Sequence, residues 1–420
     1  MIDRKSESVV VVGAGIIGIA CAHYLHQDGY AVTVVDKGVV GEGCSFRNCG
    51  HILPSHILPL NSWSAVRQGL ASLLNPRAPF KIKPTLLLET LGWFWQFARH
   101  CNPVLVHDNA IALKRLLDSS FNEFKTLPAL VRDASEWRES GLLYAFKGQR
   151  ELDKFAETEN VLSDTYGVSA QYRNSRELID DDPSLSDDLA GGFLYADDAQ
   201  VSPEALLQNW TKYLKREGVA FREQEALTSV ISDRGAVSAV RTSSGELGAD
   251  HVVLAAGAYC GPLARLFDGA LPVIPGKGYS VTLEGTAHIP SQSIVLPECN
   301  IAITPFDEAL RVGSMMEFVG FDDAIPTYRI DQLTNNVSPY FSKPLGGKVT
   351  LPWTGWRPMT WDGLPIIGRL KQLQNVVVAT GHSMIGLMTA PATGKLVSEL
   401  LSEQKTHLAC EAYSPTRFNA

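Results

Sequence analysis

The sequence lacks an apolar run long enough to cross a bilayer. The nearest approach, PTLLLETLGWFWQFA at residues 84–98, is short and contains Glu89 and Gln96. We expect a buried helix of a substrate-binding region here, with a membrane-surface patch as the alternative. The N-terminal stretch MIDRKSES is polar and leads into an apolar run broken by glycines, which predicts neither a signal peptide nor a membrane span.

The sequence also lacks a block of basic residues, paired cysteines and metal-ligand clusters. Its 37 Lys and Arg and 45 Asp and Glu give a net charge of -8, so we expect a small-molecule partner and no nucleic acid. None of the seven cysteines forms a CxxC pair, which indicates reduced thiols and a cytoplasmic location. We predict no metal site, because His51 and His56 flank a proline-containing loop and His100 and His107 have no acidic or cysteine partner at ligand spacing.

What the sequence does contain is a glycine-rich turn between a predicted strand and a predicted helix, VVVVGAGIIGIACA at residues 9–22. Gly13 permits the tight turn, Gly15 lets the backbone approach a pyrophosphate, and Gly18 lets the helix pack on the strand. A second predicted strand ends at Asp36, whose carboxylate can accept hydrogen bonds from a ribose. This order predicts a dinucleotide site. FAD and NAD both remain open here, and Asp36 disfavours NADP.

Segments typical of a nucleotide-binding sheet return later in the chain. Residues 60–140 predict helices, and SPEALLQNWTKYLKREG predicts a helix capped by Ser202 and ended by Gly218. Strand-like runs then lead to a small-residue loop at 255–257, and VVVATGHSMIG leads into a C-terminal helix. We predict an α/β fold in which a Rossmann-like domain is assembled from separated segments beside a domain with a mixed sheet.

Six motifs occur in order over nearly the whole chain: VVVVGAGIIG, SFRNCG, PGKGYSVTL, IAITPFDEALRVG, GWRPMTWDGLPIIG and TGHSMIG. Together they resemble the D-amino-acid oxidase superfamily of FAD enzymes and, within it, the bacterial D-amino-acid dehydrogenase small-subunit family. The resemblance implies a discontinuous FAD-binding domain at 1–60, 200–270 and 346–420 and an α+β substrate domain at 61–199 and 271–345. It also implies noncovalent FAD, because no cysteine lies near Arg357, where sarcosine oxidases attach their flavin.

The resemblance implies cofactor contacts in every segment of the predicted FAD domain. The first helix and Asp36 would hold the pyrophosphate and ribose, the loop from Ser45 would lie beside the flavin, and the backbone of Leu227 would meet adenine. The loop before the last helix would meet the flavin pyrimidine, where amides at a helix N-terminus favour negative charge. The predicted cofactor residues are Gly13, Gly15, Ile16, Ile17, Gly18, Asp36, Lys37, Ser45, Asn48, Gly50, His51, Leu227, Ala256, Gly257, Gly381, His382, Met384, Ile385 and Gly386.

The catalytic prediction centres on Arg357 in WTGWRPMT, which matches the family motif whose arginine binds the substrate carboxylate. A planar guanidinium fixes a carboxylate with two parallel bonds. The Cα–H would then face flavin N5, and hydride transfer would give an imino acid that hydrolyses to a 2-oxo acid and ammonia. Tyr279 is a second substrate-site candidate, with a core tyrosine as the alternative. His382 is a candidate acid or base, with a packing role as the alternative.

The resemblance leaves the substrate and the electron acceptor open. Met384 stands where glycine oxidases have a second arginine, and bulky Trp356 and Trp361 favour a compact D-proline or hydroxyproline type of substrate. We expect a D-amino-acid dehydrogenase that passes electrons to a quinone or another carrier, in the cytoplasm or at the inner face of the membrane, to which it would bind peripherally. The alternatives are an oxidase that uses O₂, an NAD-dependent dehydrogenase, and a noncatalytic flavin-binding subunit.

Overall fold

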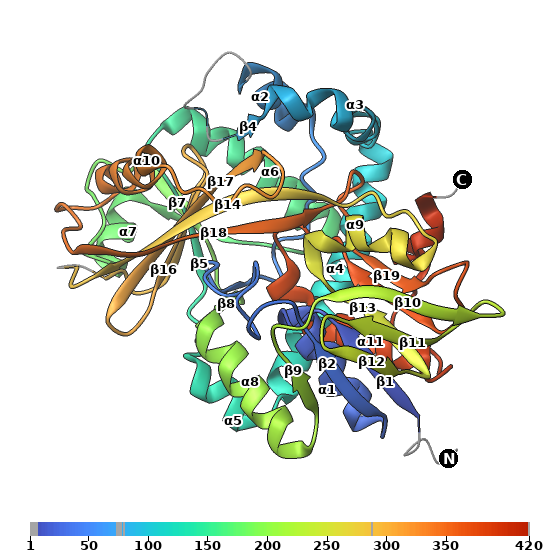
Figure 1. Ribbon diagram of the computed structural model, residues 1–420. Helices are drawn as coiled ribbons and strands as arrows, with labels where there is room; N and C mark the ends of the chain where they lie inside the picture. Colours follow the sequence, from blue (N-terminus) through green and yellow to red (C-terminus); the bar gives the residue numbers. More distant parts are fainter. Residues whose placement is uncertain (1–6, 73–77, 79, 287–288, 419–420) are drawn as a thin grey trace.

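The computed structural model describes residues 7–72, 78, 80–286 and 289–418. Its first layer is a six-stranded sheet whose strand order is β19-β20-β13-β1-β2-β9 (Figure 1). All neighbours are parallel except β19 and β20. The strands come from distant parts of the chain: β1 (Ser8–Val12), β2 (Ala31–Val35), β9 (Ala220–Arg222), β13 (His251–Leu254), β19 (Ile366–Arg369) and β20 (Val376–Thr380).

The second layer is a nine-stranded mixed sheet, which lies apart from the first in Figure 1. Its central strands are antiparallel, whereas β5 and β15 pair in parallel. Its strands are β4 (Phe80–Ile82), β5 (Leu142–Phe146), β6 (Gln171–Asn174), β7 (Gly191–Tyr195), β14 (Ile274–Glu284), β15 (Ser293–Leu296), β16 (Ile301–Pro305), β17 (Ala309–Phe318) and β18 (Lys348–Met359). The predicted domain boundary at 346 falls before β18, although β18 pairs with β14 in this sheet.

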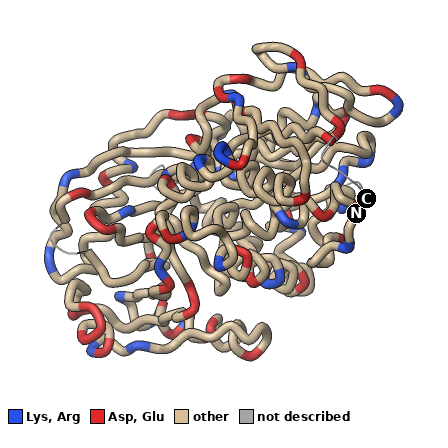
Figure 2. Tube along the Cα trace, turned by 90° about the horizontal axis from the view of Figure 1, so that it is seen from below, with Lys and Arg blue, Asp and Glu red and all other residues tan. Residues whose placement is uncertain are grey.

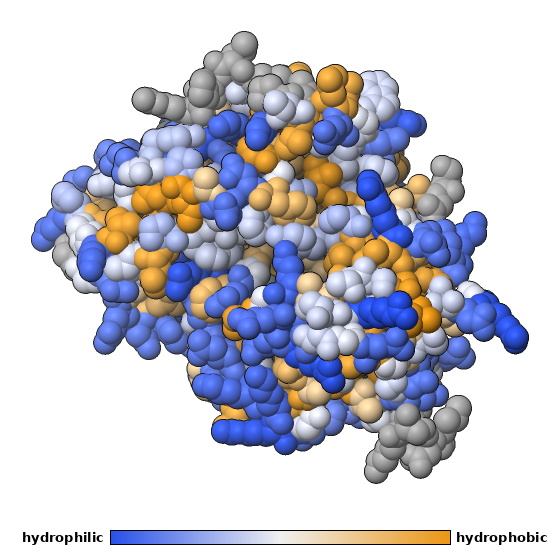
Figure 3. Space-filling model, viewed as in Figure 1, coloured by the Kyte–Doolittle hydropathy of each residue, from blue (hydrophilic) through white to orange (hydrophobic). Residues whose placement is uncertain are grey.

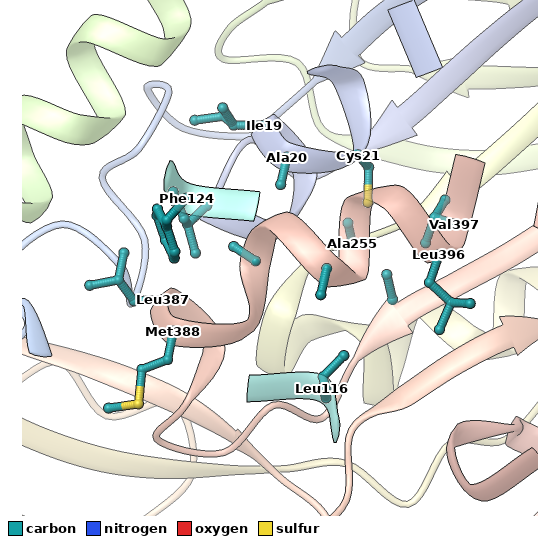
Figure 4. Packing of buried hydrophobic residues seen from close by; sticks show 14 of the residues in the cluster. Ile19, Ala20, Cys21, Leu116, Phe124, Ala255, Leu387, Met388, Leu396 and Val397 are labelled. Carbon is teal, nitrogen blue, oxygen red and sulfur yellow. The ribbon is translucent and has the colours of Figure 1, made fainter. Parts of the chain in front are cut away.

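Three helices form the core that supports the parallel sheet: α1 (Ile16–Gln27), α4 (Pro103–Thr126) and α11 (Gly386–Leu401). Figure 4 shows small and branched side chains of these helices meeting, among them Ala20, Leu116 and Val397. Gly394 lets α11 approach α1 closely, since a Cβ there would lie 2.5 Å from the carbonyl oxygen of Ala20. The N-termini of α1 and α11 thereby share one rigid support.

The predicted helix from Ser202 to Gly218 is confirmed as α8 (Pro203–Glu217). The Ser202 hydroxyl accepts a hydrogen bond from the Ala205 amide, and Gly218 ends the helix with φ +100°. The remaining helices are α2 (Trp63–Ser72), α3 (Pro84–Arg99), α5 (Ala129–Arg132), α6 (Gln149–Tyr166), α7 (Ser175–Asp181), α9 (Cys260–Leu263) and α10 (Thr327–Val337). Strands β3 (His51–Ile52) and β8 (Ala199–Gln200) pair with each other, and β10 (Leu227–Asp233), β11 (Ala236–Thr242) and β12 (Gly245–Gly248) form a small antiparallel sheet.

Charged residues of both signs are spread over the chain trace (Figure 2). Within the described residues, no helix combines the length and the hydrophobicity that crossing a bilayer requires.

Candidate active site

The N-terminus of α1 is built to accept an anion. Gly13 has φ +111°, and a Cβ there would lie 2.5 Å from the Ala255 carbonyl oxygen, so only glycine fits the turn. Gly15 caps the helix without a side-chain hydrogen bond, and no acidic residue stands in the first turn. A Cβ at Gly18 would collide with the Gly13 carbonyl oxygen, which explains the close packing of helix and turn. The positive end of the helix dipole and the first-turn amides other than that of Ile16 are therefore available to a pyrophosphate.

Asp36 lies directly beside this turn, at the end of β2. Its carboxylate accepts hydrogen bonds from the amides of Ala14 (2.7 Å) and Gly38 (2.8 Å). The backbone before Leu227 joins the same corner, because the Glu225 amide donates to the Asp36 carbonyl oxygen at 2.8 Å. The Lys37 ammonium lies 3.2 Å from the centre of the Tyr259 ring, two residues after Gly257. The residues predicted for the adenosine end of the cofactor are thus brought together.

The loop that contains Ser45, Asn48 and Gly50 lies against the same helix end. The Ser45 hydroxyl accepts a hydrogen bond from the Ile16 amide at 3.3 Å. Asn48 fixes the loop, since its side chain accepts from the Gly50 amide (2.7 Å) and donates to the Ser45 carbonyl oxygen (3.0 Å). His51 follows in β3, where burial lowers its imidazole pKa to about 4 and keeps the ring neutral.

A second helix N-terminus completes the row of predicted cofactor residues. Gly381 has φ +73°, and the loop that follows it leads into α11, which has no side-chain cap and no acid in its first turn. His382 is buried, with Nε2 3.1 Å from the Thr393 hydroxyl and Nδ1 without a partner. Burial lowers the pKa of His382 to about 3, so the ring stays neutral at physiological pH. This favours the packing and hydrogen-bonding alternative over a titrating acid or base.

Arg357 lies on β18 between these two regions. Its Nη1 donates to the Met315 carbonyl oxygen at 2.7 Å. Burial lowers the pKa of Arg357, and the nearby Cys44 and Cys49 would raise it in their thiolate forms. Among the described residues, no Asp or Glu forms an ion pair with Arg357. An arginine removed from water without a counter-charge is costly unless an anion joins it. This position therefore fits a ligand carboxylate.

Two features that hold Arg357 were not predicted from the sequence. Met315 adopts a left-handed conformation (φ +74°) where the pairing of β14 with β17 shifts register, and this bulge turns its carbonyl oxygen toward Arg357. Gly278 faces the guanidinium so closely that a Cβ would overlap it. The glycine in PGKGYS is a visible signal, but its role follows only from the pairing of β14 with β18.

The structure does not place Tyr279 beside Arg357. Successive side chains of a strand point to opposite faces, and it is Gly278 that faces the guanidinium. The buried Tyr279 hydroxyl donates to Glu317 at 2.6 Å, and Glu317 also accepts from Arg329 Nε at 2.9 Å. Since this hydroxyl is occupied by a buried ion pair, the core alternative for Tyr279 describes its position and the predicted substrate contact is not supported.

The two tryptophans also lie elsewhere than the compact-substrate hypothesis requires. Trp356 precedes Arg357 in the strand and so points to the opposite face, where its ring contacts Phe321 and Tyr259 at centroid distances of 5.8 and 6.2 Å. The Trp361 ring packs edge-on against Phe418 near the C-terminus. Trp361 also packs against the cluster that contains Met359 and Met316, and the Met316 sulfur contacts Arg357, so the D-proline type of substrate stays a prediction.

Hydrogen bonds and short contacts link these parts into one continuous site. Ser45 contacts α1, its neighbour Cys44 lies near Arg357, and the Ser383 amide donates to the Pro358 carbonyl oxygen at 3.0 Å. Two helix N-termini whose own N-cap residues make no side-chain hydrogen bond, an acidic residue beside the first and a buried imidazole nitrogen without a partner near the second match an elongated cofactor with a pyrophosphate and a polar ring. The residues present therefore fit FAD.

Comparison with known proteins defines the class. Residues 8–400 match the family described as FAD dependent oxidoreductase, and the chain belongs to this family. It is therefore an FAD-dependent amino-acid oxidoreductase, as the resemblance predicted.

The individual relatives are consistent with that class. The chain is 30% identical to the D-amino acid dehydrogenase of Neisseria meningitidis serogroup C, over 98% of this chain and 100% of the relative. Among solved structures, it is similar to glycine oxidase from Geobacillus kaustophilus (TM-score 0.79, 21% identity, 98% of this chain and 99% of the other). It is also similar to L-proline dehydrogenase from P. horikoshii (TM-score 0.75, 19% identity, 98% of both chains). These two structures confirm the predicted fold.

Proposed function

We propose that the chain dehydrogenates a D-amino acid whose carboxylate is bound by Arg357. The observation that carries this proposal is the partly buried guanidinium without an acidic partner, held in one orientation by the Met315 carbonyl oxygen. The 30% identical D-amino acid dehydrogenase supports the D configuration. The product would be an imino acid, which water converts to a 2-oxo acid and ammonia when the amine is primary.

The role of the protein in this reaction is binding and orientation. Arg357 would fix the carboxylate so that the Cα–H bond has a single direction in the site. No described residue near Arg357 has to act as a base if the amine enters neutral. FAD, when bound, supplies the redox chemistry by accepting the two electrons.

The cofactor would be held by the residues predicted from the sequence. The α1 N-terminus at Gly13–Gly18 would bind the pyrophosphate, and Asp36, Lys37 and the backbone at Leu227 would bind the adenosine. The loop at Ser45–His51, together with Ala256 and Gly257, would border the cofactor. The α11 N-terminus, at Gly381–Gly386, would hold the pyrimidine ring. Domain limits would follow the two large sheets, with β18 in the substrate domain.

We further propose that the protein binds the membrane surface and passes electrons to a quinone or another carrier. The surface of α2, α3 and the start of α4 exposes large apolar side chains, namely Trp63, Leu70, Leu88, Leu91, Trp95 and Val104. Figure 3 shows hydrophobic residues on the surface near the top of the molecule. Among the described residues between 61 and 105, four are basic (Arg67, Lys81, Lys83 and Arg99) and one is acidic (Glu89), in a chain whose net charge is -8. An apolar surface with local positive charge fits an anionic lipid surface.

An anaerobic screen tests the activity. Holoenzyme is mixed with D- and L-amino acids and N-methylglycine without oxygen, and flavin absorbance is followed. We expect D-amino acids to bleach the flavin. Bleaching by L-amino acids alone, or by none, would overturn the proposal. Hydrogen peroxide produced in air would identify O₂ as the acceptor in place of a quinone.

Vesicle binding tests the surface. We expect sedimentation with vesicles that contain anionic lipid, and loss of binding in Trp95→Glu. A matched Val161→Glu variant on α6, where the side chain is also half exposed, should bind as the wild type does. Equal binding by both variants would refute the proposed surface.

A further inference from the structure

The Arg357 side chain crosses one strand of the nine-stranded sheet to reach the next. Its backbone pairs with Gly276 of β14, and its guanidinium lies over Gly278, two residues further along that strand. There Nη1 donates to the carbonyl oxygen of Met315, which belongs to β17, the strand beyond β14. The orientation of the guanidinium therefore depends on the backbone of β17 at Met315.

A β-bulge gives the Met315 carbonyl its direction. The strands β14 and β17 pair at Lys277 with Glu317 and at Tyr279 with Ser314, so that two residues of β17 face one residue of β14 in between. Met315 is one of these two residues and has φ +74°. A left-handed methionine is unfavourable and persists only where the surrounding structure holds it. The contacts that hold this bulge therefore also hold Arg357.

A buried hydrogen bond spans the bulge on the face opposite to Arg357. The Tyr279 hydroxyl comes from the pair on one side of the bulge, and it donates at 2.6 Å to Glu317, from the pair on the other side. Tyr279 is 2% exposed and Glu317 is 3% exposed, and the Met315 side chain lies in the same buried cluster as the Tyr279 ring. Because its ends lie in the two flanking pairs, this bond opposes any change in the shape of the bulge.

Arg329 binds the same carboxylate from outside the sheet. It lies on α10 and donates from Nε to Glu317 Oε1 at 2.9 Å, whereas Tyr279 donates to Oε2. Arg329 thus neutralises Glu317, and Tyr279 provides the link between β14 and β17. Loss of the Arg329 charge would weaken the fold and leave this link in place.

We infer that Tyr279 is a positioning residue of the carboxylate site, which acts through Glu317 and the bulge at Met315 on the orientation of Arg357. The inference rests on the proposed function. Tyr279 acts without touching the substrate: its hydrogen bond keeps the Met315 carbonyl directed at Nη1, and the guanidinium keeps one orientation toward the carboxylate. Without this bond, binding of the carboxylate weakens and the steps after binding are unchanged.

The first test removes the Tyr279 hydroxyl and keeps the ring. Tyr195→Phe is the matched control for Tyr279→Phe, because the buried Tyr195 of β7 donates to the buried Glu159 at 2.5 Å, and β16, β15 and β5 lie between β7 and β17. We expect Tyr279→Phe to raise the KM for D-amino acids about tenfold and to keep kcat within about twofold of the wild type. Tyr195→Phe should lose a similar unfolding free energy and keep the wild-type KM. Equal KM values in the two variants would overturn the inference.

The second test changes the acceptor and is valid even if Tyr279→Phe does not fold. Glu317→Gln keeps a hydrogen-bonding partner for the Tyr279 hydroxyl, and Glu317→Leu removes it. Both substitutions leave Arg329 without its counter-charge, so they share this loss of stability and differ at the bulge. The KM for D-amino acids should be about tenfold higher in Glu317→Leu than in Glu317→Gln. The same KM in both would contradict a role for the bond between Tyr279 and Glu317.

Binding of an unreactive acid supplies a readout other than turnover. Propanoate is titrated into holoenzyme by calorimetry, and Tyr279→Phe should bind it about tenfold more weakly than Tyr195→Phe does. If no D-amino acid bleaches the wild-type flavin, the proposed function fails. If D-amino acids bleach it but Tyr279→Phe and Tyr195→Phe have the same KM and the same affinity for propanoate, only the inference about Tyr279 fails.

Discussion

Two arginines of the nine-stranded sheet and its covering helix α10 offer a direct comparison, because only one has an acidic partner. Arg329 is fully buried and donates from Nε to Glu317 at 2.9 Å, whereas Arg357 donates to the Met315 carbonyl oxygen and the Met316 sulfur and, among the described residues, to no acid. We predict that Arg357→Met abolishes efficient turnover at little cost in stability. Arg329→Met should instead lower the free energy of unfolding and retain efficient turnover.

The magnitudes follow from what each substitution leaves behind. Arg329→Met leaves the buried Glu317 carboxylate without its counter-charge, which costs about 3–5 kcal/mol in the free energy of unfolding. Arg357→Met removes a desolvated charge that no acid compensates, so the unfolding free energy should change by less than about 1 kcal/mol. Loss of a charge-assisted carboxylate contact worth about 3–5 kcal/mol should lower kcat/KM about 100- to 5,000-fold.

Urea unfolding of holoenzyme and anaerobic flavin reduction measure the two quantities separately. A primary amine that has no carboxylate serves as the control substrate, and the wild type and Arg357→Met should reduce their flavin with it at equal, slow rates. An unaltered KM for D-amino acids in Arg357→Met would refute the role of Arg357. So would a loss of stability as large as that of Arg329→Met.

Three further predictions concern single residues. Burial raises the pKa of Asp198 from 3.8 to about 7, so the folded protein holds a proton that the unfolded chain releases, and stability falls as pH rises from 4 to 7. The free energy of unfolding of Asp198→Asn, measured in urea relative to the wild type, should therefore increase by about 3 kcal/mol between pH 5 and pH 8. A difference between the two proteins that is the same at both pH values would contradict the raised pKa of Asp198. Gly278→Ala should displace Arg357, because the added Cβ would overlap the guanidinium, an overpacking effect of about 1–3 kcal/mol. The KM should rise about tenfold with the FAD content unchanged, and an unchanged KM would show that the guanidinium lies elsewhere. Since burial lowers the pKa of His382 to about 3, His382→Gln should leave the shape of the kcat/KM profile from pH 5 to 9 unaltered, and the disappearance of a titration limb in that variant would refute the neutral ring.

Local sequence rules were sufficient for the parts of the molecule that depend on near neighbours. The turn at Gly13–Gly18, the carboxylate at Asp36 and the helix between Ser202 and Gly218 each follow from residues close in the chain. The family resemblance supplied the assembly of the fold from distant segments. It also pointed to Arg357 and to the loops that the structure brings around it.

The surroundings of Arg357 depend on strand register, which local rules do not determine. Tyr279 and Gly278 are adjacent in one motif, and only the pairing of β14 with β18 decides which of them faces the guanidinium. The same rule applies to Trp356, because being next to Arg357 in the chain puts its ring on the other face of the strand. The bulge at Met315 has no signal in the sequence, since a left-handed methionine is imposed by its neighbours.

Helix α3 is apolar on two sides. Trp93 and Phe97 turn inward to the cluster around Met359, whereas Leu88 and Trp95 are exposed. If lipid covers the outer side of α3 as proposed, an oxidant dissolved in it would be one helix diameter, about 10 Å, from this cluster. One helix would then determine both the contact with lipid and the distance that the electrons travel.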